Sequence, residues 1–163
     1  MTGRSAPFAL MPGRSARRGA HKDMCPEGGS PMIAFDHVAV AVRRITDALD
    51  LFRDLLGGAP GEAGEGRGFT FQQFTFPGGT VELLEPRGAD SFLHRFLDGR
   101  GEGLHHITFK VRDLPRWAAQ LRAAGYRVVG ENYENPEWRE LFVHPKSGHG
   151  VLIQLAETLP PAR

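Results

Sequence analysis

The sequence predicts an α+β fold built from two tandem βαβββ modules. Three observations predict it: one strand-like stretch occurs twice, a segment with helical apolar spacing follows each copy, and further strand-like segments follow each helix. The two copies are residues 35–45 and 104–114, which align without a gap. Each has a His near its start and apolar residues at alternate positions after it. This duplication predicts two halves related by a pseudo-twofold axis, with curved mixed sheets around a shared cleft.

The first predicted module spans residues 32–87. Its first strand, 33–42, has valines at alternate positions, which is typical of a strand that packs on a helix. Apolar residues at spacings of three and four predict a helix over 48–56, with Thr46 as its cap and Gly57 at its end. The rest of the module is predicted as a flexible loop and two strands joined by a Gly-Gly turn: 61–68, 69–76 and 80–85.

The second predicted module spans residues 103–158 and repeats this order. A short helical linker over 88–102 connects it to the first module. Asp113 is the predicted cap of a helix over 114–124, and Gly125 ends that helix. Three strands are predicted to complete the module: 126–130, 139–144 and 151–157.

The segments outside the modules have a different composition. Residues 1–31 are rich in Gly, Pro, Ser and Arg and lack an apolar period, which predicts a disordered N-terminal extension. Residues 159–163 contain two prolines and are predicted to be a frayed tail. The sequence therefore predicts a single folded domain over 32–158.

The overall composition limits the classes of partner. The chain has 163 residues, of which 40% are hydrophobic and 24% charged, as in ordinary globular proteins. A formal net charge of +1 gives no indication of a nucleic acid or a membrane surface as partner. Cys25 is the single cysteine, which excludes a disulfide framework and a site with several thiolates, and favours a cytoplasmic location.

Four polar side chains recur at matched positions of the two modules. His37 aligns with His106, and Glu82 aligns with Gln154. Because successive side chains of a strand point to opposite faces, all four fall on the face turned away from the predicted helices. Two imidazoles, a carboxylate and an amide oxygen suit a divalent ion such as Co, Ni, Mn, Zn or Fe, with positions left for a substrate. The sequence therefore predicts a metal site in the shared cleft.

Other polar residues are weaker candidates. Trp138 is a candidate wall of the substrate pocket, and Lys146 and Ser147 lie in a turn that could hold an anionic substrate group. His105 is predicted to be a structural neighbour of His106. Glu140, like other glutamates outside the repeat, is expected to be solvated.

Four motifs give the chain a resemblance to a known family. They are Asp36-His37-Val38-Ala39, the run from Val81 to Pro86, the run from Gly101 to Ile107, and His144-Pro145-Lys146-Ser147. With these motifs the chain resembles the vicinal oxygen chelate superfamily, which includes glyoxalase I, over about residues 33–157. Within it the chain is most similar to the methylmalonyl-CoA epimerase branch.

The resemblance implies the same metal ligands and a mechanism. It implies a metal-dependent epimerase or isomerase, possible as a homodimer, whose acyl-CoA substrate forms an enolate that the metal stabilises. Glu82 is then both a ligand and the base that moves the proton. The chain departs from the branch at Gln154, where an acidic residue is expected. A second acid is also expected in strand 69–76, where the polar residues are Gln72, a candidate substrate contact, and Gln73.

Two alternative functions stay open from the sequence. One is a lyase similar to lactoylglutathione lyase, which also moves a proton next to a metal-bound carbonyl. The other is a ligand-sequestering protein without catalysis, similar to bleomycin-resistance proteins. An extradiol dioxygenase is disfavoured because its facial triad requires a carboxylate at the position of Gln154.

Overall fold

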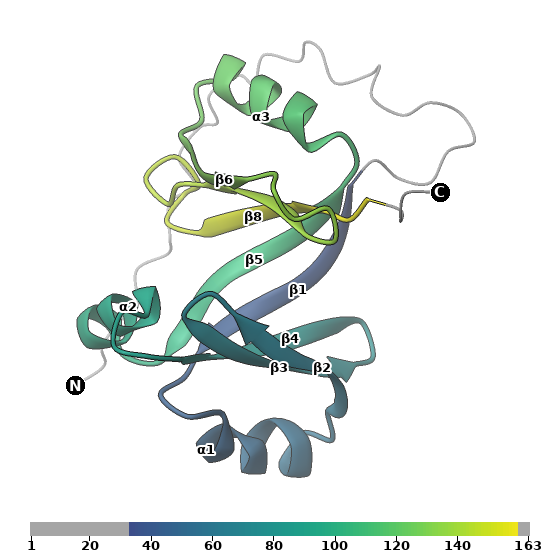
Figure 1. The fold of residues 1–163 in the computed structure, drawn as a ribbon. Coiled ribbons are helices and arrows are strands. Elements are labelled where there is room, and N and C mark those ends of the chain that lie inside the picture. The colour runs from purple at the N-terminus through teal and green to yellow at the C-terminus, as the bar shows by residue number, and fades with distance from the viewer. Residues whose placement is uncertain (1–32, 160–163) are drawn as a thin grey trace, which may run out of the picture. The chain divides into compact units, whose positions relative to one another are not determined.

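The computed structural model describes residues 33–159 (Figure 1). The predicted extension over 1–31 lies outside the described residues, as does 160–163 of the predicted tail. The helices are α1 (Ile45–Leu49), which continues as the π-helical segment η1 (Asp50–Leu55), α2 (Phe92–Arg100) and α3 (Leu114–Ala123). The strands are β1 (Ile33–Ala41), β2 (Ala59–Gly66), β3 (Phe69–Phe76), β4 (Gly79–Pro86), β5 (Gly103–Val111), β6 (Val128–Asn132), β7 (Arg139–Val143) and β8 (Leu152–Glu157).

All eight strands form one curved mixed sheet in the order β2-β3-β4-β1-β5-β8-β7-β6 (Figure 1). In the first half β1 pairs in parallel with β4, and in the second half β5 pairs in parallel with β8. The antiparallel pairing of β1 with β5 joins the two halves. Outward from this central pair, β4, β3 and β2 follow β1 in the same arrangement as β8, β7 and β6 follow β5. The predicted α+β fold with two βαβββ modules is therefore confirmed, and the two sheets are continuous with each other.

Helices α1 and α3 lie on opposite outer sides of the sheet (Figure 1). Beneath α1 lies one core cluster of buried apolar residues: Val42, just after β1, Phe74 of β3 and Leu83 of β4. The cluster beneath α3 is equivalent to it: Val111, Leu114, Ala118, Leu141 and Leu155. Burial of these residues by the hydrophobic effect fixes which face of each strand points outward. The opposite face, with its polar residues, is turned inward.

Helix α2 covers part of the inner face of the first module. Ser91 is its N-cap, and the Ser91 hydroxyl accepts a hydrogen bond of 3.3 Å from the backbone N–H of Leu93. Leu93 and Leu97 of α2 are buried against Ala39 and Ala41 of β1. The small alanine side chains leave space for the helix, so this end of the inner face is apolar. None of the helices within residues 33–159 is long and apolar enough to cross a membrane.

Strand β2 corrects the prediction of a flexible loop over 61–68. This glycine-rich segment pairs in antiparallel fashion with β3 at the edge of the sheet. A Cβ atom on Gly66 would collide with the Phe69 ring, and one on Gly64 would make a tight contact of 3.0 Å with the Phe71 ring. The absence of side chains at Gly64 and Gly66 therefore lets the aromatic rings lie over the backbone of β2.

The start of α1 also differs from the prediction. Thr46 is not the cap: the helix begins at Ile45, and the N-cap position is Arg44, whose side chain caps nothing. A carboxylate distant in sequence replaces the local cap, because Glu85 Oε2 accepts a hydrogen bond of 2.6 Å from the Ile45 N–H. In α3, the predicted cap is confirmed, since the Asp113 side chain accepts from the backbone N–H of Arg116.

Candidate metal centre

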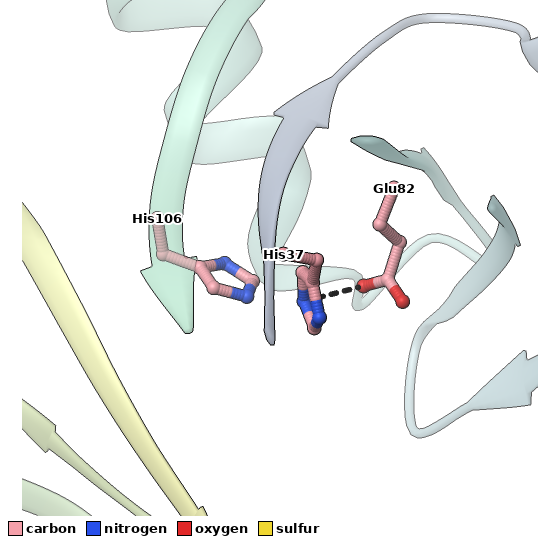
Figure 2. A group of neighbouring side chains, drawn as sticks. All are labelled: His37, Glu82 and His106. Carbon is pink, nitrogen blue, oxygen red and sulfur yellow. Dashed lines mark ion pairs between the residues drawn. The ribbon is translucent and has the colours of Figure 1, made fainter. Parts of the chain in front are cut away.

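The four predicted metal ligands come from four adjacent strands at the centre of the sheet. His37 lies on β1, Glu82 on β4, His106 on β5 and Gln154 on β8. All four are buried, with at most 8% of any residue exposed. One potential ligand atom from each of His37, Glu82 and His106 lies within 4.8 Å of the other two (Figure 2). The inward parity of the strands therefore brings together residues that are far apart in the sequence.

His37 is oriented by the residue that precedes it. The Asp36 carboxylate lies 2.7 Å from His37 Nδ1, so Nδ1 carries the proton of this hydrogen bond and Nε2 is the ring nitrogen directed at the other candidate ligands. His37 Nε2 lies 3.5 Å from Glu82 Oε1 (Figure 2). The other Glu82 oxygen accepts a hydrogen bond of 2.9 Å from Gln73 Nε2. Asp36 thus holds the His37 ring and Gln73 holds the Glu82 carboxylate. The remaining ligand atoms, His37 Nε2 and Glu82 Oε1, face each other.

His106 is oriented by His105, as the sequence predicts for a structural neighbour. The Nδ1 atoms of the two rings lie 2.8 Å apart, so a single shared proton joins them. This contact leaves Nε2 of His106 for a ligand. The His37 and His106 rings are inclined at 67° with their centroids 5.7 Å apart. The two imidazoles therefore meet edge to face across the junction of the two modules.

Gln154 is held by hydrogen bonds at both ends of its amide. Its Oε1 accepts a hydrogen bond of 2.6 Å from the hydroxyl of Thr108, a residue with no exposed surface. Thr108 Oγ1 also lies 3.0 Å from His37 Nε2. At the other end, Gln154 Nε2 donates to Glu140 Oε2 at 2.6 Å. The amide oxygen is therefore on the side of the two histidines.

Burial sets the charge states of these groups. It lowers the pKa of His106 to about 3, with a further contribution from the neighbouring His105 and His37 rings. It also lowers the pKa of His105 to about 4, together with the charge of Arg100. Burial raises the pKa of Glu82, and the His37 ring and the hydrogen bond from Gln73 partly oppose this rise. His106 is therefore neutral near pH 7, which is the form that binds metals.

These residues fit a divalent metal ion. Bonds of about 2.0–2.2 Å to nitrogen and oxygen place two ligand atoms roughly 3 to 4.4 Å apart, and the 4.8 Å limit found for His37, Glu82 and His106 is close to this range. The donor set contains a carboxylate, a neutral imidazole and a second imidazole whose Nδ1 proton faces a carboxylate. Carboxylates behind metal-binding histidines are common in such sites.

The weaker sequence candidates lie outside this cluster. The Gln72 side chain donates to the backbone of residues 61, 62 and 73, and Gln73 is the glutamine that contacts Glu82. The Ser147 hydroxyl accepts from the Arg127 N–H, and the Lys146 side chain is exposed. Trp138 is adjacent to the cluster, because its Nε1 donates to Glu140 at 3.1 Å.

Three residues at the centre were not among the sequence candidates. Asp36 and Thr108 contact His37 directly, and Glu140 contacts Gln154. Strand parity could have indicated Thr108, which shares the inward face of β5 with His106. Glu140 was expected to be solvated; instead it is half-buried and bonded to two side chains. No pattern in the sequence distinguishes it from the other glutamates.

A small cavity lies behind His105. It has a volume of about 160 Å³ and is bounded by α2, the start of β5 and the turn before β8. Phe96, Arg100 and His105 are among its lining residues. His105 also contacts His106, but none of the four predicted ligands lines the cavity itself.

The chain is similar to known proteins of one superfamily. A family model described as the glyoxalase/bleomycin resistance protein/dioxygenase superfamily matches residues 36–142. An ethylmalonyl-CoA/methylmalonyl-CoA epimerase of Cereibacter sphaeroides is 34% identical over 132 residues, which cover 75% of this chain and 96% of the relative. The human mitochondrial methylmalonyl-CoA epimerase is 28% identical, with 75% of this chain and 72% of the relative covered.

Solved structures give the same result. A methylmalonyl-CoA epimerase from Mycobacterium tuberculosis matches with a TM-score of 0.69 and 31% identity, covering 77% of this chain and 88% of that one. A methylmalonyl-CoA epimerase in complex with methylmalonyl-CoA and ammonium matches with a TM-score of 0.68 and 28% identity, covering 78% and 95%. On the evidence of the family model, the relatives and the fold, the chain belongs to the glyoxalase/bleomycin resistance protein/dioxygenase superfamily.

Proposed function

We propose that the chain is a divalent metal-dependent epimerase of acyl-CoA thioesters, acting on a methylmalonyl-CoA-like substrate. The observation that carries the proposal is the cluster of His37, Glu82 and His106, whose ligand atoms lie within 4.8 Å of one another. It supports epimerase chemistry because the relatives with this fold, at 34% and 31% identity, are acyl-CoA epimerases. The chain covers 96% of the Cereibacter sphaeroides relative, so the comparison extends over nearly all of that enzyme.

His37, Glu82, His106 and Gln154 would hold the metal. A bound divalent ion supplies positive charge that stabilises the enolate oxygens of a 1,3-dicarbonyl substrate. Asp36 and His105 hold the two imidazoles with one nitrogen of each ring directed at the centre. This support from behind reduces the reorganisation needed when the substrate binds.

Glu82 is the proposed base. It takes the proton from the carbon between the two carbonyls, the C–H bond breaks, and its electron pair passes into the adjacent carbonyl as an enolate. In the metal-free protein burial raises the pKa of Glu82, and a divalent ion bound to this carboxylate would lower it. The hydrogen bond from Gln73 at 2.9 Å keeps one Glu82 oxygen in place.

Epimerisation requires the proton to return on the opposite face of the enolate. Gln154 holds the position that matches Glu82 in the second module, and its amide does not exchange protons as a carboxylate does. Proton removal and inversion are therefore two separable observations for this chain. Exchange without inversion would mean that Glu82 removes and returns the proton on the same face of the enolate.

The experiment measures the metal content of purified protein together with deuterium uptake into racemic methylmalonyl-CoA in heavy water. We expect about one divalent ion per chain and exchange at the carbon between the carbonyls that stops when the metal is removed with EDTA. A second reaction that starts from a single epimer, followed by chiral analysis of the product, reports inversion separately from exchange. Bound metal with turnover of a glutathione hemithioacetal, and none of an acyl-CoA, would contradict the substrate class. Protein that binds no metal would contradict the proposal altogether.

A further inference from the structure

We propose that Glu140 is a positioning residue, which holds the Gln154 amide with its oxygen toward the metal centre. The inference rests on the metal site proposed above. Glu140 lies on β7 and Gln154 on the adjacent strand β8, where the register pairs Gln154 with Phe142. Glu140 is two residues before Phe142, so it is a diagonal neighbour of Gln154 on the same face. At that position Glu140 Oε2 lies 2.6 Å from Gln154 Nε2.

The orientation of this amide decides whether Gln154 can act as a ligand. A glutamine side chain has an oxygen that binds metals and an NH₂ group that does not. If the Gln154 amide rotates by about 180° around the Cγ–Cδ bond, the side chain fills the same volume but its nitrogen faces the histidines. Some neighbour must therefore distinguish the two ends of the amide.

Thr108 cannot make that distinction alone. Its hydroxyl lies 2.6 Å from the end of the amide that faces the histidines, but a hydroxyl both donates and accepts hydrogen bonds. It can thus pair with either end of Gln154. An ionised carboxylate only accepts, so Glu140 requires the NH₂ group on its own side. The oxygen then faces Thr108 and the centre.

Glu140 is itself held in place. The Trp138 indole N–H donates to the same Oε2 atom at 3.1 Å. The Trp138 ring in turn lies 3.5 Å from the ammonium nitrogen of Lys110, a cation–π contact. Lys110 shares the inward face of β5 with Thr108 and His106. The carboxylate that orients Gln154 is therefore held by Trp138, which precedes β7 and itself lies against Lys110 of β5.

The test compares metal affinity in two backgrounds. In the first, Glu140→Gln replaces the acceptor-only carboxylate with an amide that can both donate and accept. We expect metal affinity, measured by isothermal titration calorimetry, to fall about 10–100-fold. The visible absorption of the Co²⁺-loaded protein should change as well, because the fourth ligand is lost. Glu137→Gln, an exposed glutamate near the start of the same strand, is the matched control.

In the second background, Gln154→Glu supplies a ligand whose two ends are both oxygen. A carboxylate at position 154 needs no orientation, so the further change Glu140→Gln should cause no loss of metal affinity there. Equal metal affinities of the double variant E140Q/Q154E and the single variant Q154E separate orientation from a general effect of charge, because a charge effect would lower the affinity whenever Glu140 is replaced. An equal loss in both backgrounds would overturn the proposal. Circular dichroism spectra check that each variant is folded.

The outcomes distinguish this inference from the proposed function. Wild-type protein that binds no metal overturns both. Wild-type protein that binds metal, with E140Q matching the E137Q control in affinity and Co²⁺ spectrum, overturns the role of Glu140 and leaves the proposed function standing.

Discussion

Glu85 and Glu157 hold equivalent positions in the two modules and stabilise the same feature of each. Glu85 accepts a hydrogen bond of 2.6 Å from the Ile45 N–H at the start of α1, and Glu157 accepts one of 2.6 Å from the Asp113 N–H at the start of α3. Each glutamate stands three residues after a predicted metal ligand, Glu82 or Gln154. The duplication therefore extends past the candidate site to the carboxylates that tie each helix to its sheet.

Replacing either carboxylate should destabilise the fold. Glu157→Gln weakens a charge-assisted bond of a residue that is only 7% exposed, and we expect a loss of about 1–2 kcal/mol in the free energy of unfolding. Urea denaturation followed by circular dichroism measures it. The exposed control Glu137→Gln should stay within roughly 0.5 kcal/mol of wild type. Equal stabilities of the two variants would show that the bond contributes nothing.

Removal of one imidazole should abolish metal binding without unfolding the chain. His106→Ala deletes one of three clustered donors, and we expect metal affinity to fall by more than about 100-fold. Elemental analysis by mass spectrometry gives the metal content, and circular dichroism reports the fold. His94→Ala on the exposed face of α2 is the control. Unchanged metal content in His106→Ala would remove the site assignment.

Asp36, which is not a predicted ligand, should increase metal affinity through its hydrogen bond with His37. Asp36→Asn keeps the shape of the side chain but removes the charge 2.7 Å from His37 Nδ1. The ring is then less firmly held with its proton on Nδ1, and we expect affinity to fall about 10–100-fold. Calorimetric titration with Zn²⁺ or Co²⁺ measures the change. An affinity equal to that of wild type would mean that other contacts suffice to orient the ring.

Replacing Glu82 should reduce proton exchange much more than metal binding. Glu82→Gln retains an oxygen ligand and loses the base, so we expect deuterium exchange into methylmalonyl-CoA to fall about 10²–10⁴-fold, measured at saturating metal. Metal affinity should fall much less than exchange does. Retention of wild-type exchange in metal-loaded Glu82→Gln would assign the base to another residue.

Acid should destabilise the metal-free protein through its buried histidines. The folded-state pKa values of His105 and His106, about 4 and about 3, lie below the ordinary 6.5, so the unfolded chain binds more protons in between. Their contribution is fully present above pH 6.5 and is lost as pH falls, through about 4 for His105 and about 3 for His106. Glu82, with a raised pKa, contributes in the opposite direction, since its stabilising protonated form is lost as pH rises.

Urea unfolding in EDTA at several pH values between 4 and 7 measures this balance. Stability should decrease with acidification, and the decrease should be smaller in His106→Asn, which has one titrating group fewer. A decrease of the same size in the variant would exclude His106 as its source.

The sequence determined the repeat, the parity of the strands and the inward face that carries His37, Glu82, His106 and Gln154. These features follow from local rules, because a strand alternates its faces at every residue and a repeated segment repeats its structure. The predicted start of α3 at Asp113 was correct for the same reason, since that cap is made within one turn.

Only the tertiary structure decided which other groups reach the centre. Glu140 joins the site through a contact between strands, and its sequence neighbourhood does not differ from that of an ordinary surface residue. Strand parity places Thr108 on the inward face, but its contacts with His37 and Gln154 form only between strands. The strand at 59–66 and the cap of α1 by Glu85 were missed because long-range pairing stabilises both. Local propensity describes a residue's own turn or strand, whereas hydrogen bonds and burial between distant segments exist only once the chain has folded.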